Sequence, residues 1–209
     1  MKYMDCFLKI TDNVLASLYQ TAGASLVMAA LFMFAYLNIV KKGWRQTIED
    51  WWLTFRTSRS FRRVFCLAFY TSMILFRTLF NRGLWFNSLN NLLGTWGLYD
   101  KNGVFTTEVI ENLLLFIPFT ILYLWVFREK LLEKQMGFFK TVWRATRLTF
   151  LVSFVIEFLQ LFLRVGTFQL SDLFYNTLGG FIGGLIYWIA YKIAHRKNKK
   201  KNIKENQGN

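Results

Sequence analysis

Seven polar residues that could do chemistry stand within or at the ends of long apolar stretches of this 209-residue chain. Carboxyl groups could move protons or bind a cation, amides could hydrogen-bond a ligand, and a guanidinium could pair with a carboxylate. Such groups are costly inside a bilayer, so each is a candidate for function. The set is Arg77, Glu111, Asn112, Glu157, Gln160, Asp172 and Asn176.

Helical spacing places several of these residues on shared faces. Glu157, Gln160 and Arg164 recur at intervals of three and four residues, so they project from one face of a helix. Asp172 and Asn176 lie four residues apart and share a face of another helix. In an enzymatic site, Glu157 or Asp172 would serve as the acid or base. Nothing in the spacing demands chemistry rather than binding.

A structural role is the alternative for the same residues. Polar side chains hold membrane helices together, and Arg77–Glu157 and Gln160–Asn176 would be suitable pairs. The only histidine, His195, stands in the basic C-terminal stretch, away from the acids, so a histidine-based metal site or catalytic triad is not supported. No phosphate-binding glycine loop or dinucleotide fingerprint occurs. We therefore expect no metal ion and no cofactor.

Long apolar segments must position these residues. The chain is 54% hydrophobic and 18% charged, which excludes a disordered or water-soluble basic protein, and its single proline leaves helices largely unbroken. A helix needs about 20 mostly apolar residues to span a bilayer, and five segments approach that length. We predict an all-α fold, a polytopic integral membrane helical bundle of about five transmembrane helices, at about Val14–Val40, Val64–Phe80, Val109–Phe127, Leu148–Leu163 and Leu173–Ala194.

Lysine and arginine set the expected orientation. The formal net charge is +14, and most basic residues fall between the first and second segments, between the third and fourth, or in the C-terminal stretch. Cytoplasmic loops carry the basic excess, so we expect the N-terminus outside and the C-terminus in the cytoplasm. The polar residues then lie in the outer half of the membrane. The alternative of a cleavable signal peptide is disfavoured, because the first segment lacks the charged start and the small-residue cleavage site.

Three regions follow from this reading. In the first loop, Trp44, Ile48, Trp51 and Phe55 recur at helical spacing, which predicts an amphipathic helix over 44–56 that lies on the inner interface or packs on the bundle as a lid. Basic loops and the tail favour anionic lipid over nucleic acid as a partner. The regions are 1–69, the first helix with its amphipathic loop; 70–194, a transmembrane core; and 195–209, a disordered basic cytoplasmic tail.

Two overlapping small-residue repeats in the fifth segment predict close helix packing. Gly179 and Gly183 form one repeat, and Gly180 and Gly184 form the other. Such repeats let a second helix backbone approach closely.

Three motifs in the transmembrane core resemble boxes of the VanZ-like family of bacterial membrane proteins. Residues 111–119, ENLLLFIPF, resemble its N-x-x-x-F-I-P-F box. Residues 153–160, SFVIEFLQ, are similar to its S-x-x-I-E-x-x-Q box, and residues 171–180, SDLFYNTLGG, to its D-x-x-x-N-T-x-G-G box. A weaker similarity covers 78–82. The resemblance extends over roughly residues 70–192 and leaves out the first segment and the amphipathic loop.

The resemblance also implies residues and a role. Gly166 stands where the family usually has arginine, and Arg164 lies two positions upstream of it, so Arg164 does not match directly. The family implies a role in resistance to teicoplanin and related lipoglycopeptides. The residues that match its motifs directly are Asn112, Glu157, Gln160, Asp172 and Asn176.

Together these observations predict a multi-pass protein of the bacterial plasma membrane. We expect a non-enzymatic envelope protein that binds a lipid-linked envelope precursor or a lipoglycopeptide at a polar site in the outer leaflet. One alternative is a membrane-embedded enzyme that modifies a lipid-linked envelope precursor. The other is a small transporter that uses Glu157 as a proton relay.

Overall fold

The computed structural model describes residues 2–38, 44–80, 82–84, 89–100, 102–128 and 137–207. These residues are mostly helical and contain no strand beyond one isolated bridge between Tyr99 and Phe105, so the predicted all-α class is confirmed for the part described. The elements are α1 (Lys2–Asn38), α2 (Trp44–Thr57), α3 (Arg59–Leu75), the short π-helical turn η1 (Phe76–Phe80), α4 (Glu108–Val126), α6 (Phe138–Leu163) and α7 (Leu170–Gln207).

Five helices of the described chain are long and apolar enough to cross a membrane, as predicted. The helices begin earlier than the apolar stretches, because hydropathy marks the lipid-facing part of a helix and not its end. Before α3, the Ser58 hydroxyl accepts the Phe61 N–H at 3.2 Å and so caps the helix. The candidate spans are Leu8–Leu37, Arg59–Phe80, Glu108–Val126, Phe138–Leu163 and Leu170–Ala194.

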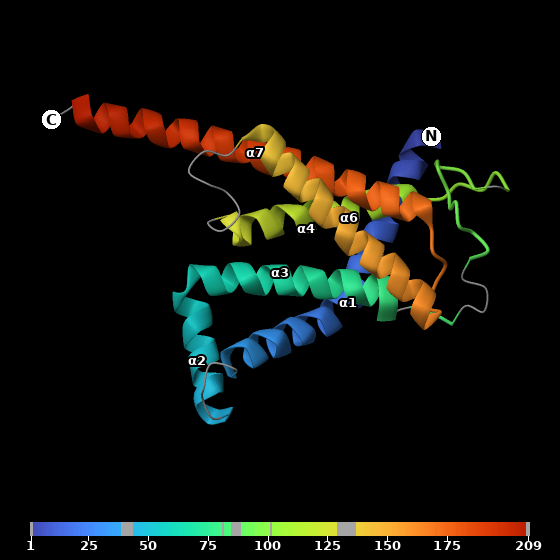
Figure 1. Ribbon diagram of the computed structural model, residues 1–209, viewed down its shortest axis with the longest axis horizontal. Coiled ribbons are helices and arrows are strands. Elements are labelled where there is room, and N and C mark those ends of the chain that lie inside the picture. Colours follow the sequence, from blue (N-terminus) through green and yellow to red (C-terminus); the bar gives the residue numbers. More distant parts are fainter. Residues whose placement is uncertain are drawn as a thin grey trace.

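Helix α7 packs between α4 and α6, and its glycines make this possible (Figure 1). A Cβ atom at Gly179 would lie 2.3 Å from the Leu113 carbonyl oxygen of α4. A Cβ atom at Gly180 would lie 2.1 Å from the Thr149 hydroxyl oxygen of α6. Both distances are shorter than any van der Waals contact, so the predicted small-residue packing is confirmed. Thr149 in turn hydrogen-bonds Thr120 of α4 at 3.0 Å, which joins the two flanking helices.

Helix α2 is helical where the amphipathic helix was predicted, and it packs on the bundle. It runs across the end of α3 at a steep angle, transverse to the long helices (Figure 1). The Trp51 ring stacks on Phe55 with centroids 5.3 Å apart and meets Phe61 and Phe65 of α3 edge-on. The neighbouring Trp52 remains half exposed. One face of α2 therefore packs on the bundle while another stays free.

The predicted disordered tail is helical in the structure. Helix α7 continues without a break from its apolar part through Gln207, in the stretch where the sequence predicts a disordered tail over 195–209. Extending an existing helix costs no new nucleation, and the Lys, Arg, Gln and Glu of this stretch are good helix formers. Low apolar content rules out a packed core here but not a helix.

Candidate functional site

Most of the polar residues gather at one end of the bundle, called here the acid end. It comprises η1, the start of α4, the end of α6 and the start of α7, together with the segments 89–100 and 102–107 (right-hand side of Figure 1). The N-terminal part of α1 reaches the same end, because Asn13 Nδ2 donates a 2.9 Å hydrogen bond to the Thr107 hydroxyl just before α4. The opposite end holds α2 and the basic residues that surround it, and is called the basic end.

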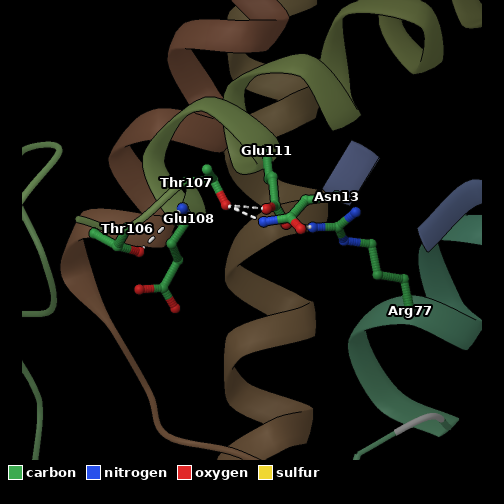
Figure 2. Close-up of polar contacts among 6 residues, drawn as sticks. All are labelled: Asn13, Arg77, Thr106, Thr107, Glu108 and Glu111. Atoms are coloured by element: carbon green, nitrogen blue, oxygen red, sulfur yellow. Dashed lines mark hydrogen bonds and ion pairs between the residues drawn. The ribbon is translucent and has the colours of Figure 1, made fainter. Parts of the chain in front are cut away.

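Arg77 and Glu111 form an ion pair at the acid end (Figure 2). Arg77 Nη2 donates to Glu111 Oε2, and the Thr107 hydroxyl donates to the other carboxylate oxygen. With Asn13 bound to Thr107, the network joins α1, η1 and α4. The expected Arg77–Glu157 pair is wrong, since η1 turns Arg77 toward α4 and not toward α6. This network explains Arg77 and Glu111 as links between helices.

Glu157 lies at the end of α6 with only 2% of its surface exposed. Its Oε2 accepts a 2.9 Å hydrogen bond from the backbone N–H of Gln169, the residue just before α7. A carboxylate at the start of a helix satisfies a free N–H and interacts favourably with the helix dipole. Glu157 therefore fixes the turn between α6 and α7.

Asp172 stands on the first turn of α7 and is 6% exposed. Ser171 and Asn112 lie beside it, so α7 and α4 both contribute to its surroundings. Asn112 Nδ2 nevertheless makes no hydrogen bond of good geometry to the residues described. Asp172 is also an electrostatic neighbour of Glu157 and Glu108. Three carboxyl groups from α4, α6 and α7 thus share one region.

Arg82 is the cation of this region, and the sequence reading missed its role. It interacts electrostatically with Glu108, Glu157 and Asp172. Its guanidinium lies against the α6–α7 turn, where a Cβ atom at Gly166 would be 3.1 Å from Arg82 Nη1. Arg82 and Glu108 were missed because they lie outside or at the edge of the apolar stretches. Only the weak motif at 78–82 could have pointed to Arg82.

Gln160 and Asn176 each present a buried amide oxygen without a donor in the part of the chain described. Gln160 Nε2 donates to the Thr78 carbonyl of η1 at 2.8 Å, and Asn176 Nδ2 donates to the Ser153 hydroxyl of α6 at 2.9 Å. The expected Gln160–Asn176 pair is therefore wrong. Most buried polar atoms in proteins are hydrogen-bonded, so two unpartnered acceptors mark a place where a donor is missing.

The segment 89–100 covers the start of α7. The Leu92 carbonyl accepts the Leu170 N–H at 2.9 Å, and the Trp96 carbonyl accepts the Tyr175 hydroxyl at 2.9 Å. Gly94 has a φ of +70°, and a Cβ atom there would lie 1.9 Å from the Ser171 hydroxyl oxygen. Only glycine combines that backbone with such a close approach. The segment therefore forms a fitted cover beside Asp172.

Arg164 does not join the acid end in the predicted way. Helix α6 stops at Leu163, and Arg164 adopts a left-handed φ of 55° as the helix cap. Its side chain is exposed. The predicted helical face therefore ends at Gln160, because the backbone of Arg164, four residues later, is no longer helical.

The arrangement is rich in hydrogen-bond acceptors. Among the residues described, it offers the carboxyl groups of Glu108, Glu157 and Asp172 and two amide oxygens without a donor, beside the Arg82 guanidinium and the unpartnered Asn112 Nδ2. Such a set suits a ligand that brings donors, such as hydroxyl or ammonium groups. In the described ranges, no three His, Cys, Asp or Glu side chains are placed to hold a metal ion.

A sequence model of the VanZ/LLP1 family matches residues 23–191. The matched region includes α2 and much of α1, so it begins well before the motif-based resemblance that started at about residue 70. No curated protein and no solved structure matches the chain.

Proposed function

Since the chain belongs to the VanZ/LLP1 family, we propose that this membrane protein binds a donor-rich envelope molecule at its acid end and thereby contributes to resistance to teicoplanin and related lipoglycopeptides. The ligand is a lipid-linked envelope precursor or the lipoglycopeptide itself. Both carry sugars, whose hydroxyl and amino groups are hydrogen-bond donors, and both carry an apolar tail that partitions into a leaflet.

One observation carries the proposal: buried acceptors with no donor stand beside buried carboxyl groups. Gln160 and Asn176 are 1% and 4% exposed, and each keeps an unpartnered amide oxygen within the residues described. Glu157 and Asp172 lie in the same region, with Arg82 as counter-ion. Leaving such acceptors unpaired costs about 1–3 kcal/mol each, and a ligand that supplies donors recovers this free energy.

The proposed orientation brings the ligand to the site. We infer that the acid end faces the outside of the bacterial plasma membrane and the basic end the cytoplasm. The support is the distribution of charge, since Arg45, Arg56 and Arg59 stand at the end opposite to Glu157. In this orientation the site meets molecules anchored in the outer leaflet.

A susceptibility assay tests the proposal. Bacteria that lack the native copy receive the wild type, Glu157→Gln, Asp172→Asn or the control Asp12→Asn, an exposed carboxyl of α1 near the same end. We expect teicoplanin tolerance with the wild type and Asp12→Asn, and the empty-vector value with the two site variants at equal membrane expression. Wild-type tolerance in both site variants contradicts the proposed site.

A second candidate function is modification of a lipid-linked precursor, with Glu157 and Asp172 as acid and base. The observation that favours it is that these two carboxyl groups are close enough to interact electrostatically. Mass spectrometry of the envelope precursors separates the two functions. A new precursor species that disappears with Glu157→Gln indicates an enzyme, whereas unchanged precursors together with resistance indicate binding.

A further inference from the structure

An apolar groove lies at the basic end, far from the carboxyl cluster, in the angle between α1 and α2. Its volume is about 320 Å³, at the lower end of the range for small-molecule sites. The lining residues of α1 are three or four positions apart and so lie on one face of that helix. The two lining residues of α2 are three positions apart and also share a face. The lining residues are Val27, Ala30, Leu31 and Phe34 of α1 with Ile48 and Trp51 of α2.

The position of α2 sets the depth of this groove. Helix α2 runs transverse to the membrane-length helices (Figure 1), so in a bilayer it lies along the interface at the basic end. Helix α1 passes from this end into the hydrocarbon. The groove between them therefore opens at the level where the acyl chains of phospholipids begin.

Two polar features next to the groove match the upper part of a phospholipid. Arg45 is exposed and stands one helical turn before Ile48 of the groove wall. The indole N–H of Trp51 has no acceptor among the described residues, and the ester carbonyls of a phospholipid are acceptors at this depth. A guanidinium at the headgroup level attracts an anionic phosphate.

Further cations strengthen the choice of an anionic lipid. Arg56 lies over the Trp52 ring of α2 at 4.6 Å, and Arg62 donates to the Phe55 and Arg56 carbonyls at the end of α2. Both keep positive charge beside the interfacial helix. A zwitterionic lipid would gain less from this field than an anionic lipid.

We propose that the α1–α2 groove is a binding site for one anionic phospholipid, with an acyl chain between the two helices and the headgroup beside Arg45. This site is independent of the proposed function at the acid end. The lipid has a structural role: it holds α2 against α1 by filling a gap between the two helices that no described side chain fills.

Native mass spectrometry tests the site on the full-length protein. The purified protein is mixed in detergent with equal amounts of dioleoyl phosphatidylglycerol and dioleoyl phosphatidylcholine, which differ only in the headgroup. We expect the wild type to retain one phosphatidylglycerol. Ala30→Trp fills the groove and excludes at least two methylenes, so retention falls about tenfold.

Matched variants control for general damage. Leu26→Trp places the same ring on an exposed part of α1 outside the groove and leaves retention unchanged. Ile48→Trp fills the groove from the α2 side and gives a second variant if Ala30→Trp elutes as aggregate. Arg45→Gln lowers the preference for phosphatidylglycerol about fivefold, whereas Arg147→Gln, an exposed arginine of α6, does not.

Three results overturn the proposal. Equal retention by the wild type and both groove-filling variants shows that the lipid binds elsewhere. Equal retention of the two lipids by the wild type refutes the role of charge. A dimer that carries no lipid, and that Ala30→Trp converts to monomer, assigns the groove to a second copy of the chain.

Discussion

Gly179→Ala tests the packing that brings the polar residues of α4 and α7 together. The new Cβ atom would lie 2.3 Å from the Leu113 carbonyl oxygen, and this oxygen belongs to the backbone of α4 and cannot rotate away. Overpacking a tight contact costs about 1–3 kcal/mol, and a rigid backbone partner favours the upper end of this range. Replacing a helical glycine by alanine returns about 1 kcal/mol of helix propensity. The net expected loss is about 2 kcal/mol.

The measurement is thermal unfolding of the purified protein in detergent. For a chain of this size, a loss of about 2 kcal/mol lowers Tm by about 4–8 °C. The matched control is Gly23→Ala in α1, where a Cβ atom meets nothing within 4 Å. This variant keeps the propensity gain without the clash, so its Tm stays equal or rises. Equal Tm values for the two variants would refute the argument that the α4–α7 distance requires glycine.

Three further predictions concern the contacts around the site. Arg77→Gln alone lowers Tm more than Arg77→Gln combined with Glu111→Gln, because the single change leaves a partly buried carboxylate unpaired; a Tm of the double variant below that of the single variant contradicts this. Ser58→Ala removes the cap of α3 and costs about 1 kcal/mol, seen as a lower Tm than that of the wild type. Gly94→Ala detaches the cover from Ser171, so hydrogen exchange quickens at the Leu170 amide but stays slow within α4; unchanged exchange at Leu170 argues against the fitted cover.

The position of each polar residue along its helix was predictable from the sequence, and rotation about each helix was not. Hydropathy located all five membrane-length helices and so placed Glu111 and Glu157 near the same end. It could not say which of them faces Arg77, because that depends on how η1 and α4 pack. For the same reason the sequence could not predict the partners of Gln160 and Asn176. Gln160 donates to a backbone carbonyl of η1, and Asn176 donates to a hydroxyl of α6.

The role of charged residues at the edges of the apolar stretches was also not predictable from hydropathy. Arg82 lies beyond the second apolar stretch and Glu108 just before the third, so a search for charges inside spans passes over both. Their role arises only when the connecting segments fold back over the helix ends. The close approach of α7 to its neighbouring helices was easier to predict, because four-residue spacing of small residues is by itself a signal for helix packing. The residues are Gly179, Gly180, Gly183 and Gly184.

The cover over α7 has a consequence for biosynthesis. Its anchors, Leu170 and Tyr175, belong to α7, whereas Leu92 and Trp96 are synthesised much earlier. The segment 89–100 therefore waits without these partners until α7 has inserted beside α4. A nascent chain arrested before α7 should leave residues 89–100 open to protease, and release of the full chain should protect them.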